Sequence, residues 1–415
     1  MKPERPLRLH EGHGLELELV IVDTESLDVR PIADRVLFEA SGDESGDHDA
    51  GRISWSNELV LHCVELKTSA PERELGTVAA DFQESVRALE ALLERHGARL
   101  MPTGMHPWMD PVRETVLWPH AYGEVYRAYD RLFDCRRHGW ANLQSVHLNL
   151  SFGDDEEFGR LHAAVRLVLP ILPALAASSP VMDGRVTGVL DNRLEVYRTN
   201  ATRIPRMTGA VIPELLWDGA SYRRTILEPL QTEVAALDGE GLLEGEWLNA
   251  RGAIARFDRD AVEIRLLDTQ ECPAADVAIA WAVACVVRGL CSERWCSGAA
   301  QRAFAVEPLS ALLRDSIRLG PAARVADPAY ARALGWTRAA LPTTGELWES
   351  LIESCVAGAP DTTASLLAPL ERVQREGTLA ERILRRLGPA PDRPRLRALY
   401  RELCDCLRAG AQLSG

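Results

Sequence analysis

The chain has 415 residues, 46% of them hydrophobic and 26% charged, and its formal net charge is −14. These values are ordinary for a globular protein, and the length suffices for a large buried core. The acidic balance argues against nucleic acid as the main partner, because phosphate binding needs a basic surface, but a nucleotide needs only a local positive patch.

The first predicted element is a half-buried strand at residues 14–23, GLELELVIVD, because apolar and polar residues alternate along it. Its leucines face one side, and Glu16 and Glu18 face the other. The polar stretch 41–52, SGDESGDHDAGR, predicts an exposed, mobile loop. Residues 58–67, ELVLHCVELK, predict a second strand.

Apolar residues recur at helical spacing from Val78 and predict a helix that stops near Gly97. Further elements are predicted in this order: a helix at 122–135, a strand at 144–151, a helix at 155–178 broken by Pro170 and Pro173, a loop region with a short helix at 180–214, a helix at 222–238 and a strand at 261–268.

The sequence after Pro273 is helical in character. Strands alternate with long helical segments, but no glycine-rich strand-to-helix turn of the dinucleotide-binding type is present. We therefore predict an α+β domain at 1–300 and a helical C-terminal region at 301–415 packed on it. Residues 321–328 are the candidate joint.

Paired acids on strand faces are the first candidate site. Glu16 and Glu18 point the same way from one strand, and close like charges are relieved by a cation such as Mg²⁺. The plainer alternatives are a solvated strand face for this pair and a surface ion pair with a lysine for Glu65. Glu58 lies seven residues before Glu65, so a regular strand puts it on the opposite face unless a bulge or turn intervenes.

Two later strands carry polar side chains opposite their apolar residues. His147 and Asn149 share one face, where the histidine can bind a metal or contact a nucleotide. Glu263 and Arg265 share another, where the glutamate suits a metal and the arginine a phosphoryl oxygen. The plainer alternatives are a core or surface histidine and a local ion pair.

Four arginines in the 180–214 loop region form a positive cluster in an acidic chain, which suits phosphates or a substrate carboxylate. Scattered surface arginines are the alternative. The four are Arg193, Arg198, Arg203 and Arg206. No Walker-type, GxSxG, HExxH or kinase signature is present, so ATP would bind by another scheme.

The nine cysteines include no CxxC pair, and their number is odd. This predicts reduced thiols and a cytoplasmic location rather than a disulfide framework or zinc knuckle. The N-terminal residues 1–14 lack the apolar core of a signal peptide. The apolar stretches near 163–177 and 275–290 are interrupted by charges or prolines, so no membrane span is expected.

Six of these segments, in this order, resemble the glutamate–cysteine ligase family, specifically the bacterial type 2 carboxylate–amine ligases. The matching stretches are GLELELVIVD at 14–23, VELKTSAP at 64–71, QSVHLNLSF at 144–152, AASSPVMDGRVTGVLDNR at 176–193, IPRMTG at 204–209 and VEIRLLDTQ at 262–270. The family's usual serine and aromatic residue before the loop arginine are Asp191 and Asn192 here, which leaves the substrate open.

The resemblance implies a glutamine-synthetase-like fold, in which a curved, mostly antiparallel sheet forms a funnel with helices outside. It also implies ATP and Mg²⁺ as cofactors. The implied metal ligands are Glu16, Glu18, Glu65, His147 and Glu263, to which Glu58 is added on the condition that a turn intervenes. ATP contacts are expected from His147, Asn149 and Arg265, catalysis from Glu263 and Arg265, and substrate contacts from Arg193 and Arg198.

The expected activity is ATP-dependent amide formation through an acyl phosphate. The family's namesake reaction joins glutamate to cysteine and gives γ-glutamylcysteine, a precursor in glutathione biosynthesis. Three alternatives stay open: a ligase with a different acid or amine, a guanidino-type phosphotransferase, and a non-catalytic nucleotide-binding relative. The expected partners are small-molecule amino acid substrates, and the sequence leaves open whether copies of the chain form a homo-oligomer.

Overall fold

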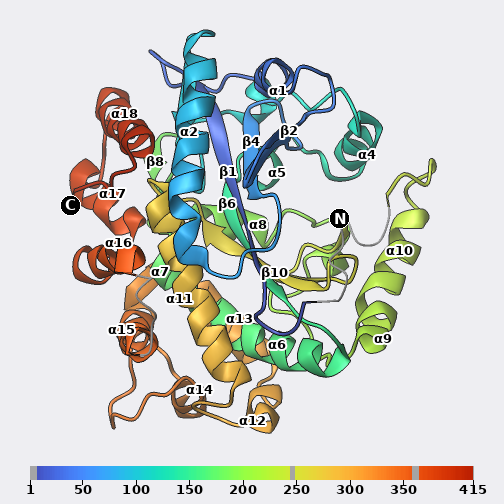
Figure 1. The fold of residues 1–415 in the computed structure, drawn as a ribbon, viewed down its shortest axis with the longest axis vertical. Helices are drawn as coiled ribbons and strands as arrows, with labels where there is room; N and C mark the ends of the chain where they lie inside the picture. Colours follow the sequence, from blue (N-terminus) through green and yellow to red (C-terminus); the bar gives the residue numbers. More distant parts are fainter. Residues whose placement is uncertain (1–6, 244–247, 358–363, 415) are drawn as a thin grey trace.

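The computed structural model describes residues 7–243, 248–357 and 364–414. Residues 1–6, part of the N-terminal segment predicted to lack a signal peptide, lie outside the described residues. Figure 1 shows a twisted sheet crossed by two long helices, α2 and α11, with the C-terminal helices gathered along one side.

The main sheet has eight strands and only antiparallel pairings, in the order β2-β3-β4-β1-β6-β10-β9, with β5 beside the end of β1. Its strands are β1 (His13–Asp23), β2 (Asp47–Ala50), β3 (Ile53–Asn57), β4 (Cys63–Thr68), β5 (Ala98–Met101), β6 (Ser145–Ser151), β9 (Ala253–Arg256) and β10 (Ala261–Asp268). A separate two-stranded ribbon pairs β7 (Val181–Met182) with β8 (Arg185–Val186).

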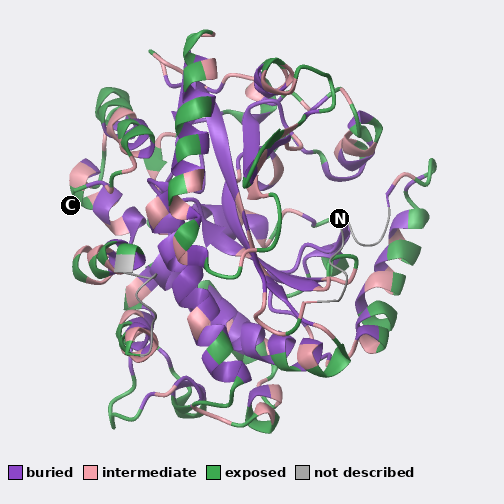
Figure 2. Ribbon diagram, in the orientation of Figure 1, coloured by how far each residue is buried: buried purple, intermediate pink, exposed green. Residues whose placement is uncertain are grey.

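One face of the sheet is apolar because apolar and polar residues alternate along β1, β4, β6 and β10, and the strand register places the apolar residues side by side. Leu15, Leu17 and Leu19 of β1 are at most 1% exposed and belong to the main core. Three helices supply the opposing side of that core: α2 (Ala79–Glu94), α6 (Asp155–Val168) and α11 (Pro273–Cys291). Figure 2 shows β1 and most of α11 buried, while the outer helices keep an exposed side.

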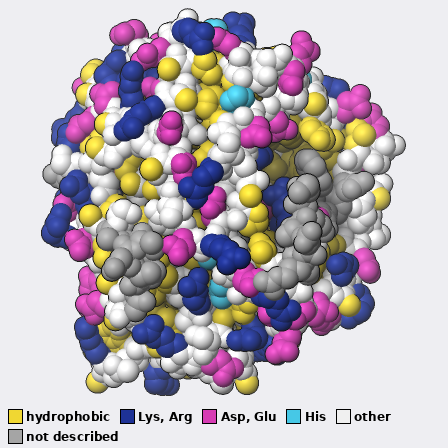
Figure 3. Space-filling model, in the orientation of Figure 1, with side chains coloured by type: hydrophobic (Ala, Val, Ile, Leu, Met, Phe, Trp, Pro, Cys, Tyr) yellow, Lys and Arg dark blue, Asp and Glu magenta, His cyan; other side chains and the backbone are white. Residues whose placement is uncertain are grey.

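Helix α11 alone among the described helices is long and apolar enough to cross a membrane, and 83% of its 18-residue apolar window is buried inside the protein. It packs against α2, α6, α15 and α16. These contacts make it the central core helix of the fold. Figure 3 shows acidic and basic side chains interspersed on the viewed surface.

The remaining helices surround this frame. Before α11 they are α1 (Ala33–Ser41), α3 (Pro111–Glu114), α4 (Gly123–Phe133), α5 (His138–Ala141), α7 (Pro173–Ala176), α8 (Asn192–Tyr197), α9 (Gly219–Tyr222) and α10 (Glu228–Ala235). After it come α12 (Gly298–Arg302), α13 (Val306–Leu319), α14 (Pro328–Ala333), α15 (Thr344–Val356), α16 (Ala364–Glu376), α17 (Leu379–Leu387) and α18 (Arg393–Ala409).

The second face of β1 is divided between polar and apolar residues. Glu16 and Glu18 stay in a polar cluster, whereas Val20 and Val22 enter a second core with Tyr400 and other residues of α17 and α18. The C-terminal helices therefore cover one end of this face and leave the other end to the polar residues.

The predicted α+β class, with a mostly antiparallel sheet and helices outside, is confirmed. Two local predictions were wrong. The expected loop at 41–52 contains β2, and the expected strand at 58–67 begins only at Cys63, after a turn. Strands β3, β5, β7, β8 and β9 were not predicted. The described residues after Pro273 are mainly helical, and a domain boundary at residue 300 stays a prediction.

Candidate active site

The predicted acidic residues come together on the polar face of four adjacent strands, β4, β1, β6 and β10. The register places Glu18 opposite Glu65, and Glu16 opposite His147. It also places Glu263 opposite Asn149. The sheet pairing therefore unites residues from segments up to about 250 positions apart, as the sequence predicted.

Glu16, His147 and Glu263 form a trio whose ligand atoms all lie within 4.8 Å of one another. The Nδ1 atom of His147 lies 3.0 Å from Oε2 of Glu16 and 3.8 Å from Oε1 of Glu263. Two carboxylate oxygens and an imidazole nitrogen facing one point fit a divalent cation, and carboxylate oxygens are the ligands that Mg²⁺ prefers. The donor set thus fits the implied metal.

Electrostatics in the trio depend on the histidine. Burial lowers the pKa of His147, but the hydrogen bond with Glu16 and the charge of Glu18 outweigh burial and raise it. Burial likewise opposes ionisation of Glu16, yet the hydrogen bond from His147 keeps the Glu16 pKa well below its ordinary value. The raised pKa favours the protonated form of His147 beside the carboxylates, and a divalent cation bound here would compete with that proton.

Ser145 fixes the neighbouring carboxylate, Glu18. Its backbone N–H and its hydroxyl both donate to Oε2 of Glu18, at 2.7 and 2.8 Å. The same hydroxyl lies 2.9 Å from Nε2 of His147. One serine therefore positions both Glu18 and His147.

Glu65 is buried on the polar face of the sheet, where it forms an ion pair with Lys67. The sequence analysis had offered an ion pair with a lysine as the plainer explanation of Glu65, but at the protein surface. It accepts hydrogen bonds from Lys67 Nζ at 2.8 Å and from Ser56 Oγ at 2.9 Å. Lys67 lies opposite Glu16 in the strand register. This ammonium group places a cation beside the carboxylates, and the sequence analysis gave it no part in the active site.

Glu58 lies on the same face of the sheet as Glu65. A regular strand through both residues, which would place them on opposite faces, is therefore wrong. It follows β3, in which Ser56 lies opposite Glu65, and the chain turns before β4 begins. Burial, followed by the charges of Glu18 and Glu65, raises the pKa of Glu58 well above its ordinary value. The turn meets the condition set for Glu58, but among the described residues the ligand atoms that come within 4.8 Å of one another belong to Glu16, His147 and Glu263, so metal binding by Glu58 stays a prediction.

We expect Glu58→Gln to stabilise the metal-free chain by about 1 kcal/mol at pH 8. Because the pKa of Glu58 is higher in the folded than in the unfolded state, its contribution to stability is present at low pH and falls as pH rises. Glutamine cannot ionise, so the advantage should grow above the ordinary glutamate pKa of 4.5 and vanish below it. Thermal unfolding in EDTA at pH 4.5 and 8 measures this, and an equal difference at both values would contradict it.

The two loop arginines differ in their surroundings. Arg193 of α8 is buried. Its Nε donates to Asp268 Oδ1 at 2.5 Å, and its Nη1 donates to the Arg265 carbonyl oxygen at 3.2 Å. Arg198 is half-exposed and pairs with Glu195 on its own helix at 2.6 Å. The structure thus brings Arg193 beside β10 and leaves Arg198 on the helix surface, and their substrate contacts stay predictions.

Arg265 lies within the polar face. Its Nε donates to Oε1 of Glu263 at 2.5 Å, and its side chain is 28% exposed. Asn149 lies nearby and donates to Oε1 of Glu16 at 3.0 Å. Asp268 joins this region because a bulge between Ile264 and Leu267 shifts the register of β10. No sequence signal revealed that shift.

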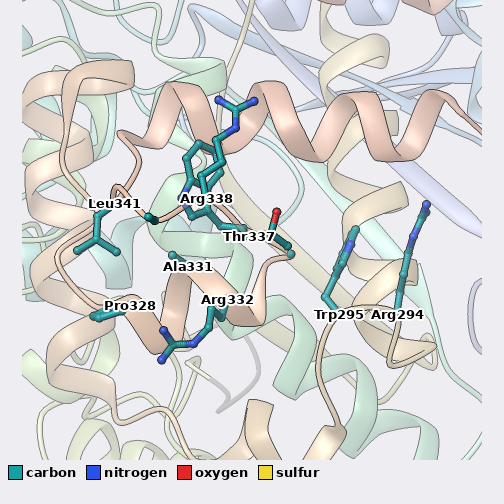
Figure 4. A pocket seen from close by; sticks show the side chains of 11 residues that line it. Arg294, Trp295, Pro328, Ala331, Arg332, Thr337, Arg338 and Leu341 are labelled. Carbon is teal, nitrogen blue, oxygen red and sulfur yellow. The ribbon is translucent and has the colours of Figure 1, made fainter.

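A cavity of about 670 Å³ lies elsewhere, in the C-terminal helical region (Figure 4). Residues around α14 and the segment after it form much of the lining, together with Arg294 and Trp295. The side chains of Arg294, Arg332 and Arg338 point in different directions in Figure 4. None of the predicted site residues lines this cavity, so it is not part of the polar face.

Solved structures with the same fold include two enzymes. Glutamate–cysteine ligase from Francisella tularensis in complex with AMP aligns with a TM-score of 0.59 and 14% identity, covering 97% of this chain and 90% of that one. A bifunctional glutathione synthetase from Pasteurella multocida gives a TM-score of 0.63 and 15% identity, covering 96% and 52% of the two chains. At these identities the likeness shows the fold.

Sequence relatives extend over most of the chain. An uncharacterised protein from Archaeoglobus fulgidus is 31% identical over 394 residues, which cover 95% of this chain and 98% of the relative. A "Putative glutamate--cysteine ligase 2" from Leifsonia xyli is 28% identical over 48% of this chain and 50% of its own length. The sequence model of glutamate-cysteine ligase family 2 matches residues 13–402, and the chain belongs to that family.

Proposed function

We propose that the chain joins the γ-carboxylate of glutamate to the amine of cysteine, with cleavage of ATP to ADP and phosphate. Family membership makes it an ATP-dependent ligase of the glutamate–cysteine ligase type, while the particular acid and amine and the use of Mg²⁺ are the proposal. The observation that carries the proposal is the trio of Glu16, His147 and Glu263 with Arg265 beside it on one sheet face.

A carboxylate must be activated before an amine can displace one of its oxygens. Transfer of the γ-phosphoryl group of ATP gives an acyl phosphate, from which phosphate leaves when the amine attacks. The trio would hold Mg²⁺, which when bound neutralises phosphate charge. Arg265 is partly exposed beside Glu263, so its guanidinium can stabilise charge on the transferred phosphoryl group.

Two further observations support this assignment. The Francisella relative of the same fold was solved with AMP, which accords with a nucleotide in this fold. All nine cysteines are free thiols, which accords with the cytoplasmic location expected from the sequence.

The test is a substrate screen with the purified chain, ATP and Mg²⁺, in which ADP, phosphate and the organic product are measured separately. Phosphate release that requires both glutamate and cysteine, with γ-glutamylcysteine as product, supports the proposal. Release with another acid or amine would identify a different ligase, and a phosphorylated acceptor without free phosphate a phosphotransferase. Absence of turnover with every pair would favour a nucleotide-binding relative.

A further inference from the structure

Arg256, at the end of β9, lies between two carboxylates. Its Nη1 donates to Oε2 of Glu263 at 3.1 Å, while Nε and Nη2 each lie 3.3 Å from an oxygen of Asp258. Side-chain exposure falls along this series, from 43% for Asp258 to 21% for Arg256 and 1% for Glu263. The three residues therefore form a chain of contacts from the surface to the trio.

These contacts distinguish the two oxygens of Glu263. Oε2 is held by Arg256, whereas Oε1 faces His147 at 3.8 Å and accepts a hydrogen bond from Arg265. The two oxygens of a carboxylate are equivalent and the terminal torsion of a glutamate is broad, so the side chain does not by itself fix the orientation of the carboxylate plane. Arg256 on one oxygen and Arg265 on the other restrict that orientation.

Glu16 shows the same arrangement with a different partner. Asn149 donates to Oε1 at 3.0 Å, which leaves Oε2 facing His147. In each carboxylate of the trio one oxygen is thus held by Asn149 or Arg256, while the other lies 3.0 or 3.8 Å from Nδ1 of His147. Loss of such outer partners typically weakens metal binding about 10- to 100-fold.

We infer that Arg256, braced by Asp258, is a positioning residue that orients Glu263 toward a divalent cation. The inference rests on the proposed function, because it presupposes a cation at the trio. The competing account is plain repulsion, in which a guanidinium near the trio weakens cation binding by its charge. The two accounts predict opposite effects when the charge of Arg256 is removed.

The experiment measures Mn²⁺ affinity of the full chain without nucleotide, by the loss of the free-ion electron paramagnetic resonance signal. Arg256→Lys keeps the charge, but its ammonium group cannot contact Asp258 and Glu263 at the same time, as the planar guanidinium does. Arg256→Gln removes the charge. We expect both variants to raise the Kd for Mn²⁺ about 10-fold or more, with unfolding temperatures close to that of the unaltered chain. Arg408→Gln, an exposed arginine of α18 paired with Glu94, is the control and should leave the Kd unchanged.

The outcomes separate the two proposals. If the unaltered chain binds Mn²⁺ and Arg256→Lys binds it equally well, the positioning role is overturned. Tighter binding by Arg256→Gln would also overturn it, in favour of repulsion. If the unaltered chain binds no Mn²⁺, the metal site of the proposed function fails, and this inference fails with it.

Discussion

Glu263→Gln is expected to lower ADP formation by more than about 100-fold, because a bound divalent cation contributes several kcal/mol to phosphoryl transfer. Glu263 is 1% exposed, and it supplies one carboxylate oxygen to the trio. Glutamine has nearly the same shape but carries no negative charge for the cation. ADP release with ATP, Mg²⁺ and both substrates is the measurement, and circular dichroism checks that the variant folds.

A matched control is Glu94→Gln on α2, where an exposed glutamate pairs with Arg408. This control should retain the activity of the unaltered chain, since it makes the same chemical change outside the polar face. Glu16→Ala should show a loss as large as Glu263→Gln, because it removes another ligand of the same cation. Retained activity in Glu16→Ala or in Glu263→Gln would contradict the metal assignment.

The strand faces could be predicted because one side of this sheet is apolar. In β1 and β10, alternation alone separates Glu16 and Glu263 from the leucines that enter the core. Their proximity depends on the pairing of β1 with β6 and of β6 with β10, which joins distant segments. Periodicity carries no information on such pairing, so the resemblance to a family had to supply it.

The errors in the site arose where the backbone departs from regular strand geometry. A turn between β3 and β4 brings Glu58 to the side of Glu65, and a bulge in β10 brings Asp268 beside Arg193. Both features change strand parity without an unusual residue to mark them. Arg256 was missed because β9 is a four-residue edge strand, too short for a clear alternation.

Asp268 and Arg193 form a buried ion pair that joins β10 to α8 near Arg265. The two side chains are 0% and 2% exposed. Asp268 Oδ2 also accepts from the Ser178 N–H at 2.9 Å and the Ser179 hydroxyl at 2.8 Å. The carboxylate therefore accepts from Arg193, from both donors of Ser178 and from Ser179, and its loss would leave the buried Arg193 without this ion-pair partner.

Asp268→Ala is accordingly expected to reduce the free energy of unfolding by about 3–5 kcal/mol, the usual cost of removing one partner of a buried ion pair. Urea unfolding followed by tryptophan fluorescence measures the loss. The double variant Asp268→Ala with Arg193→Met should lose less than the single variant, because it leaves no buried charge without a partner. If both variants are equally destabilised, the cost comes from the hydrogen bonds of Ser178 and Ser179 rather than from the unpaired arginine. A loss below about 1 kcal/mol in the single variant would contradict a structural role for the pair, since surface ion pairs contribute that little.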